Sequence, residues 1–413
     1  MGRIDDLIQQ YCPEGVEYKP IGDIMYISDY VSAGSFASIR ENVTYLSEPS
    51  FAILLRFADF SSNFDPSKFV YVDEHAYNFM KKSNLDPGDI IMSNVGSCGS
   101  LFACPDLGMP MTLAPNSIVI KTSNNRFYYH WLSSEMAQKE IAKIKSKSAM
   151  PKFNKTDFKK IMAPCPPEEV QKAIANSLDK FDRLSAELQA ELQAELQARK
   201  QQYEYYRNQL LTRFAPDQPV TEYSLGELGT FTYGFTAKAK DNGKIRYIRI
   251  TDINEGGFLN PHNAKYVDES EEINGYLLKK GDLVMARTGA TYGKTLFYEE
   301  EYPSIYASFL IKISLKDIVN PRYYWHFSKS RYYWEQANRL VGGGAQPQFN
   351  TGAISQVKIP LPPLSEQSRI VAILDKFEAL VNDLSQGLPA EIAAVQEQYE
   401  YYRDKLLTFK TKE

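Results

Sequence analysis

The second half of this chain repeats the first, and this duplication limits the possible folds more than any other feature. Gln-Tyr-Glu-Tyr-Tyr-Arg occurs at 202–207 and again at 398–403, so the two copies start 196 positions apart (398 − 202). Leu-Asp-Lys-Phe recurs at the same separation, at 178–181 and 374–377. A repeating unit of this length is too long for a solenoid. The sequence therefore predicts an internally duplicated protein with two globular modules.

Each module is expected to end in a long helix. After a proline-rich stop at 164–167, the segment from Glu168 to about Thr212 contains no Gly or Pro and is rich in Leu, Ala, Glu, Gln and Lys. This composition favours a helix. Its apolar residues recur at helical spacing and form one stripe, which needs a partner helix. The stripe consists of Leu178, Phe181, Leu184, Leu188, Leu192 and Leu196.

The second module supplies the partner helix, from about Ser365 to Thr408. Its Gly-Leu-Pro sequence at 387–389 is expected to break or kink this helix. Because a whole module connects the two helices, we expect them to pack antiparallel as a coiled coil. This arrangement gives the chain a pseudo-two-fold internal repeat.

The first helix also contains three successive copies of Ala-Glu-Leu-Gln, at 186–197. A period of four residues exceeds the helical period of 3.6 by about 40° per step, so the apolar stripe turns around the helix. Two interpretations stay open: a low-complexity helix, or a spacer whose length matters.

The segments before the helices are predicted to be mixed α/β with short strands. Strand-like runs lie at 117–121, 244–250, 283–285 and 310–313, and Gly, Asn and Asp turns separate them. One aromatic helix is expected after the strands of each module, at 127–144 and 323–340. The predicted fold class is α+β, with two tandem mixed α/β domains at 1–160 and 214–358 and two helical regions at 161–213 and 359–413.

Composition excludes several classes of protein. The 413 residues include 47 Lys+Arg and 51 Asp+Glu, the formal net charge is −4, and 43% of the residues are hydrophobic, as in soluble globular domains. The longest apolar runs have five residues, whereas a bilayer-spanning helix needs roughly 20. With no apolar leader in the first 25 residues, the expectation is a cytoplasmic protein without membrane contact. The four cysteines form no CxxC pair, so neither a zinc site nor a disulfide framework is expected.

No catalytic site is evident. Gly-Ala-Thr-Tyr-Gly-Lys-Thr at 289–295 resembles a phosphate-binding P-loop, but three residues separate its glycines where four are required. Asn-Pro-Arg-Tyr at 320–323 resembles the Asn-Pro-Pro-Tyr motif of adenine methyltransferases but lacks the second proline. His130 and His326 coincide in the repeat, yet both lie in the predicted aromatic helices, where a structural role is favoured. We therefore expect no catalytic residue, no cofactor and no metal.

Local charge favours contact with phosphates. Residues 139–160 contain eight lysines against Glu140 and Asp157, and the equivalent stretch of the second module, 322–358, also has a basic excess. A basic stretch that recurs in a duplicated module, close to Arg, Gln and Asn side chains that can read base edges, favours a sequence-specific DNA-binding scaffold. The alternatives are an assembly protein whose modules bind protein, and an enzyme built from duplicated catalytic domains.

Six segments together are typical of one known family. They are the two Gln-Tyr-Glu-Tyr-Tyr-Arg helices, Pro-Leu-Pro-Pro-Leu-Ser-Glu-Gln at 360–367, Leu-Asp-Lys-Phe at 374–377, Arg-Thr-Gly-Ala-Thr-Tyr-Gly-Lys at 287–294 and Cys-Pro-Glu-Gly-Val-Glu-Tyr at 12–18. In these segments, and over nearly its whole length, the chain resembles the specificity subunit of type I restriction-modification systems. The resemblance implies two target recognition domains, each of which reads half of a split, asymmetric sequence in double-stranded DNA. It also implies that the helices set the separation of the halves and dock two methyltransferase subunits.

The same resemblance implies that methylation and ATP-dependent cleavage reside in partner methyltransferase and restriction/translocase subunits, so that this chain is not itself an enzyme. The residues expected to contact DNA are Asn94, Ser97, Lys145, Lys147, Lys152, Asn154, Arg246, Arg287, Thr291, Tyr292, Lys294, Gln346, Gln348 and Asn350. The residues expected in the coiled coil and at the partner-subunit surface are Leu188, Leu192, Leu196, Tyr205, Tyr206, Arg207, Tyr401, Tyr402 and Arg403. The loop 94–100 lacks the Arg and Lys of 287–294, as two modules that read different half-sites require.

Overall fold

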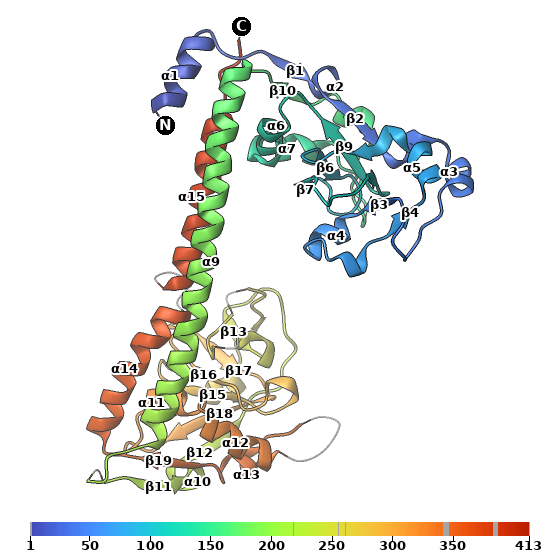
Figure 1. The fold of residues 1–413 in the computed structure, drawn as a ribbon. Coiled ribbons are helices and arrows are strands. Elements are labelled where there is room, and N and C mark those ends of the chain that lie inside the picture. Colours follow the sequence, from blue (N-terminus) through green and yellow to red (C-terminus); the bar gives the residue numbers. More distant parts are fainter. Residues whose placement is uncertain are drawn as a thin grey trace. The chain divides into compact units, whose positions relative to one another are not determined.

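The computed structural model describes residues 2–217, 219–254, 256–260, 262–341, 347–382 and 387–412. The chain forms two compact units (Figure 1): unit 1 comprises 1–189 and 394–413, and unit 2 comprises 190–393. The long helix α9 (Glu168–Thr212) contributes its first half to unit 1 and its second half to unit 2, and its bounds confirm the predicted helix. The division between the units falls inside the run of tetrapeptides.

Unit 1 contains two four-stranded sheets that share a core. One sheet has the strand order β2-β9-β6-β7 and is antiparallel throughout. The other has the order β4-β3-β8-β5, in which β3 and β8 run parallel. Side chains from both sheets, among them Leu55, Ile91, Phe102 and Val119, form one buried cluster. The strands are β1 (Tyr18–Pro20), β2 (Tyr26–Asp29), β3 (Ala52–Leu55), β4 (Tyr71–Val72), β5 (Asn84–Leu85), β6 (Ile90–Ser93), β7 (Leu101–Ala103), β8 (Met111–Leu113), β9 (Ser117–Lys121) and β10 (Met162–Pro164).

The helices of unit 1 differ from the prediction at one point. The aromatic segment expected as one helix forms two, α6 and α7, because Ser134 interrupts it and caps the second helix by accepting a hydrogen bond from the Ala137 amide. The helices before α9 are α1 (Gly2–Tyr11), α2 (Ile21–Ile24), α3 (Phe36–Asn42), α4 (Phe57–Ser61), α5 (Glu74–Phe79), α6 (Asn125–Ser133), α7 (Glu135–Ile144) and α8 (Lys155–Phe158).

Unit 2 repeats this topology, except that its second sheet has three strands. Its sheets have the orders β12-β18-β15-β16 and β14-β13-β17, and β11 pairs with β19 as β1 pairs with β10 in unit 1. The strands are β11 (Thr221–Ser224), β12 (Gly229–Tyr233), β13 (Ile245–Ile248), β14 (Tyr266–Val267), β15 (Leu283–Ala286), β16 (Thr295–Phe297), β17 (Ser304–Tyr306), β18 (Leu310–Leu315) and β19 (Lys358–Leu361). The predicted strands are therefore confirmed in both modules.

The helices of unit 2 follow the same plan as those of unit 1. Its aromatic segment is again split, here at Ser330, which caps the second helix by accepting from the Tyr333 amide. The helices are α10 (Leu225–Leu228), α11 (Pro321–Phe327), α12 (Arg331–Leu340), α13 (Thr351–Ile354) and α14 (Leu364–Asn382). The next helix, α15, spans Leu388–Leu407, so the predicted interruption of the second long helix is confirmed.

In each unit α9 packs antiparallel against a helix from the end of the chain. In unit 1 the ring of Phe181 stacks on Tyr402, with 6.2 Å between centroids, and Gln189 donates a hydrogen bond to Gln396. In unit 2 the ring of Tyr203 stacks on Phe377 at 6.2 Å. In unit 1 the residue number on α15 falls as that on α9 rises, which is the predicted antiparallel direction.

The apolar stripe of α9 is only partly covered. Leu178 and Leu196 are buried, as the prediction requires. Leu184 and Leu188, however, are 56% and 43% exposed, so this part of the stripe faces solvent. Among the described residues, no helix is both long and apolar enough to cross a membrane.

Candidate nucleic-acid interface

Three loop segments of unit 2 meet at the ends of its strands. They are 287–294 after β15, 307–309 between β17 and β18, and 347–350 before α13. The Arg287 amide donates to the Phe309 carbonyl oxygen at 3.1 Å, and the Phe349 amide donates to the Arg287 carbonyl oxygen at 2.8 Å. We call these three segments loop junction 2. They bring together most residues predicted to read DNA in the second module.

Unit 1 has an equivalent loop junction 1, formed by 94–100, 114–116 and 151–154. The Asn94 amide donates to the Asn116 carbonyl oxygen at 3.1 Å, and the Phe153 amide donates to the Asn94 carbonyl oxygen at 3.1 Å. A β-bridge joins Val95 to Lys152, as another joins Thr288 to Gln348 in unit 2. The duplication has therefore kept the main-chain connections of the junctions, although their side chains differ.

Arg287 is the most distinctive side chain of loop junction 2. Its Nε donates to the Ser308 carbonyl oxygen at 3.1 Å, and its guanidinium lies 5.2 Å from the ring centroid of Tyr233 and 5.5 Å from that of Phe309. These contacts fix the guanidinium through the aromatic faces. No described residue accepts a hydrogen bond from its two terminal nitrogens, so both can donate to a ligand.

Other predicted residues of unit 2 have structural contacts. Asn350 caps α13 by accepting from the Ala353 amide, and Tyr292 donates to Asn338 while its ring packs on Trp334 and Phe349. Thr291 is half-buried, Lys294 lines a pocket, Gln348 is exposed, and Gln346 lies outside the described residues.

Arg246 does not face a free surface. It is 6% exposed, donates to the Asn260 carbonyl oxygen at 2.7 Å and is hydrogen bonded to the Tyr302 hydroxyl. The prediction that Arg246 contacts DNA needs an accessible cation. The structure instead places the guanidinium inside unit 2, where it joins two loops.

In unit 1 the predicted residues divide in the same way. Ser97, Lys147 and Lys152 are exposed and Lys145 is half-buried at the end of α7. Asn154 caps α8 by accepting from the Asp157 amide at 2.7 Å. The exposed lysines are free to reach a phosphate backbone.

The two basic stretches differ in the ion pairs that their side chains form and in how far these side chains are buried. In 139–160, half of the lysines form ion pairs, namely Lys139, Lys143, Lys155 and Lys160. Within the described residues, Lys145, Lys147 and Lys152 form none. In 322–358, Arg322, Lys329 and Arg331 pair with Asp375, Glu378 and Glu335. Arg322 and Lys329 are largely buried, whereas Arg331 is exposed, so a basic face on unit 2 stays a prediction.

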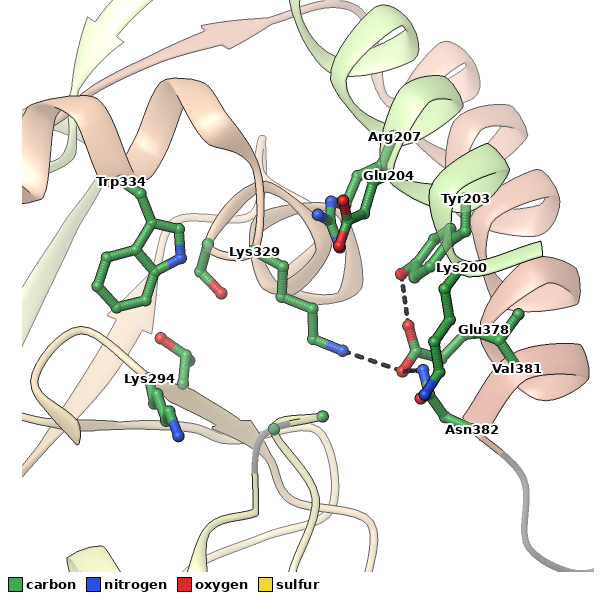
Figure 2. A pocket seen from close by; sticks show the side chains of 14 residues that line it. Lys200, Tyr203, Glu204, Arg207, Lys294, Lys329, Trp334, Glu378, Val381 and Asn382 are labelled. Atoms are coloured by element: carbon green, nitrogen blue, oxygen red, sulfur yellow. Dashed lines mark hydrogen bonds and ion pairs between the residues drawn. The ribbon is translucent and has the colours of Figure 1, made fainter. Parts of the chain in front are cut away.

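The buried Lys329 lines a cavity of about 370 Å³ in unit 2 (Figure 2). Lys329, between α11 and α12, reaches Glu378 on α14 at 3.2 Å, and Glu378 also accepts from the Tyr203 hydroxyl of α9. The Lys329 ammonium lies 3.2 Å from the Trp325 ring centroid. Burial lowers the pKa of Lys329 to about 7, although Glu378 opposes this shift.

A contact between a histidine and an aspartate occurs in both units. Nε2 of His130 lies 2.7 Å from Asp179, and Nε2 of His326 lies 2.7 Å from Asp375, so the aromatic helix is tied to the long helix that follows it. An arginine one turn earlier, Arg126 or Arg322, also binds the same aspartate. The structural role predicted for the histidines is confirmed.

The described residues offer one group of possible metal ligands. His130, Asp179 and Asp182 could present three ligand atoms close together. Nε2 of His130 is already hydrogen bonded to Asp179, and Arg126 binds both oxygens of that carboxylate. This donor set favours a hydrogen-bonded structural cluster over a metal site.

The predicted partner-subunit residues lie on the helices of both units. Leu188, Tyr205, Tyr206 and Tyr401 are exposed, whereas Leu192 and Leu196 pack in the core of unit 2. Tyr402 is half-buried and stacks on Phe181, and the guanidinium groups of Arg207 and Arg403 lie over Tyr203 and Tyr399. The exposed members leave apolar area on the helices available for a partner.

One Arg–Asp pair, repeated near the loop junction of each unit, was not predicted from the sequence. Arg56 and Asp59 follow β3, and Arg249 and Asp252 follow β13. Each arginine forms an ion pair with its aspartate. The signal was present, because Arg-x-x-Asp recurs 193 positions apart (249 − 56), close to the separation of the other repeats.

Comparisons with known proteins agree on one family. The family model of the type I restriction modification DNA specificity domain matches residues 13–198 and 218–394. The Escherichia coli type I restriction enzyme EcoR124I/EcoR124II specificity subunit is 32% identical over 305 residues, which cover 69% of this chain and 70% of that protein.

Two solved structures share the fold. One, from work on complex assembly and conformational transition of the type I R-M system, has a TM-score of 0.68 at 16% identity and covers 96% of this chain and 98% of its own. The HsdS subunit from Thermoanaerobacter tengcongensis has a TM-score of 0.52 at 16% identity and covers 96% and 97%. With two copies of the family's domain along its sequence and the duplicated fold described above, this chain belongs to the specificity subunits of type I restriction-modification systems.

Proposed function

We propose that this chain reads a bipartite, asymmetric DNA site, with one block of defined bases for each unit, and that it carries no catalytic site itself. The observation that supports this proposal is the pair of loop junctions. Their main-chain hydrogen bonds are the same in both units, whereas the side chains at equivalent positions differ, for example Asn94 and Arg287. Such a pair is suited to reading two different sequences from one scaffold.

The chemistry of loop junction 2 suits direct readout. The two free terminal nitrogens of Arg287 can donate to O6 and N7 of one guanine, and Gln348 is exposed beside it. A good bidentate contact contributes roughly 1–3 kcal/mol of discrimination against the wrong base. In loop junction 1, Asn94 and Ser97 occupy the equivalent segment, and the lysines at 145, 147 and 152 supply phosphate contacts.

We further propose that the helices assemble partner subunits. Two methyltransferase subunits would dock on the exposed apolar side chains of the helices, and restriction/translocase subunits would join this assembly on DNA. Leu184, Leu188 and Tyr401 in unit 1, with Tyr205 and Tyr206 in unit 2, are the candidates because large apolar side chains rarely stay exposed together without a partner. The domain limits that go with this proposal are 1–160 and 214–358 for DNA reading and 161–213 and 359–413 for assembly.

The test is selection of bound duplexes from a random pool by the chain with methyltransferase subunits present. We expect two short conserved blocks separated by bases without preference. One uninterrupted block, or binding without any sequence preference, would contradict the proposal. The second outcome, with intact assembly of the subunits, would instead favour a protein-binding scaffold.

A further inference from the structure

The Arg-x-x-Asp pair has the same geometry in both units. Nε and Nη2 of Arg56 donate to the two carboxylate oxygens of Asp59 at 3.1 and 2.6 Å. In unit 2, Nε and Nη2 of Arg249 donate to Asp252 at 3.0 and 2.8 Å. In both pairs the arginine amide also donates to the aspartate, at 2.8 and 2.7 Å. Each arginine is therefore held as a rigid, two-point ion pair at the end of a strand.

A further contact completes the fixation of each arginine. Nη2 of Arg56 donates to the Lys68 carbonyl oxygen at 2.6 Å, and Nη2 of Arg249 donates to the Asn263 carbonyl oxygen at 3.1 Å. With Nε and Nη2 engaged, Nη1 has no acceptor among the described residues. The aspartates are 0% and 3% exposed, whereas the arginines are 33% and 29% exposed. The carboxylate is inside, and the unused edge of the guanidinium reaches the surface.

The pairs also lie at the loop junctions. Strand β3 runs parallel to β8, and β13 runs parallel to β17, so the residues that follow neighbouring strands meet at one sheet edge. Arg56 follows β3 there and lines a cavity of about 460 Å³ together with Ser97 and Asn116 of loop junction 1. Arg249 follows β13, and the segment 307–309 of loop junction 2 follows β17. Both arginines thus stand beside the surfaces proposed to face DNA.

We propose that Arg56 and Arg249 each hold one phosphate of the DNA backbone and so position the two units on their half-sites. This proposal rests on the proposed function of DNA reading. A guanine edge is best read by two guanidinium nitrogens, and here only Nη1 is free, which suits a single phosphate oxygen. A residue that is identical in two units cannot distinguish two different half-sites. It is suited to a contact with what all half-sites share, which is the sugar-phosphate backbone.

The alternative role for these pairs is purely structural, because a buried carboxylate needs its cation. Removal of the arginine alone would leave Asp59 uncompensated and would confuse the two roles. The double substitution Arg56→Leu with Asp59→Asn avoids this problem, because the asparagine is neutral and keeps an acceptor for the residue 56 amide. Asp59→Asn alone is the matched variant that changes the pair but keeps the guanidinium. The corresponding variants in unit 2 are Arg249→Leu with Asp252→Asn, and Asp252→Asn alone.

The experiment measures affinity of the full chain, assembled with methyltransferase subunits, for its selected duplex and for an unrelated duplex over a series of salt concentrations. Each phosphate contact contributes about 0.9 to the slope of log affinity against log salt. We expect each double variant to make this slope about 0.9 less negative on both duplexes, with the ratio of the two affinities unchanged within about twofold. Asp59→Asn and Asp252→Asn alone should keep the slope of the unmodified chain.

Three outcomes would contradict either the phosphate contact or the proposed function. A slope that stays unchanged in folded double variants, judged by thermal melting and by subunit assembly, overturns the phosphate role and leaves a structural pair. A loss of sequence preference would also overturn it, because it would make the arginine a base-reading residue. If the unmodified chain shows no salt-dependent binding to DNA, the proposed function itself has failed.

Discussion

The buried Lys329–Glu378 pair gives unit 2 a specific dependence of stability on pH. Burial lowers the pKa of Lys329 to about 7, from the ordinary value of 10.5 that it regains in the unfolded chain. Between these values the unfolded chain binds one proton more than the folded chain. The free energy of unfolding of unit 2 therefore rises with pH, by at most about 1.4 kcal/mol per pH unit.

Other groups in this network titrate outside that window. Burial lowers the pKa of His326, so its contribution is confined to acidic pH. Burial raises the pKa of Tyr203, which makes stability fall only above about pH 10. Between pH 7 and 9.5, Lys329 is thus the group that changes.

The perturbation is the double substitution Lys329→Met with Glu378→Gln, which removes both charges and leaves a hydrogen-bonding side chain for Tyr203. Between pH 7 and 9.5 the rise in the original chain is at most roughly 3.5 kcal/mol, at about 1.4 kcal/mol for each pH unit. We expect the double variant to be as stable as the original chain or more stable at pH 7, and to lose the rise.

Urea unfolding followed by tryptophan fluorescence at pH 7, 8, 9 and 9.5 measures both effects. Trp325 and Trp334 both belong to unit 2, and Trp325 lies directly beside Lys329. Glu378→Gln alone is the comparison that keeps the lysine. A free energy of unfolding of unit 2 that does not change over this range, or a rise that persists in the double variant, would refute the reasoning.

The remaining predictions concern DNA binding. Arg287→Ala should reduce discrimination within one block of the site by roughly 1–3 kcal/mol, measured by competition between single-base variants, while Lys147→Ala should weaken binding to all duplexes alike and make the salt slope about 0.9 less negative. Exchange of residues 214–358 for the equivalent module of a relative should change one selected block and leave the other intact. Deletion of 190–193 removes one tetrapeptide, about 6 Å of helix, and should shorten the gap between the blocks by one or two base pairs in a selection experiment; an unchanged gap at full affinity would show that the tetrapeptides are only low-complexity helix.

The repeat and the helix periodicity carried most of the fold prediction. A segment without Gly or Pro from Glu168 onward could be recognised as a helix with nearly correct bounds, and the Gly-Leu-Pro sequence marked the break in the second helix. The aromatic segments were harder to predict. Ser134 and Ser330 look like ordinary helix residues in the sequence, and only the fold shows that each is an N-cap that divides the segment.

Sequence could locate the candidate interface but not the direction of its side chains. The Gly-flanked segment at 287–294 was correctly expected to be a loop, yet the half-buried ring of Tyr292 packs against the core and Arg246 is buried between loops. A charge run states nothing about burial, so Lys329 counted as a surface cation until its partner Glu378, 49 residues further along, was known. Pairs of this kind depend on which helix packs against which strand.

The main-chain hydrogen bonds that hold the loop junctions have a consequence for how such a protein can change over time. Amide and carbonyl groups are supplied by almost every residue type, so substitution of the side chains at 94, 97 or 348 leaves these bonds in place. Point mutations on this surface can therefore accumulate without a large loss of folding free energy. A library randomised at these positions should consist mostly of folded proteins, which would make the loop junctions a favourable starting point for natural or laboratory retargeting.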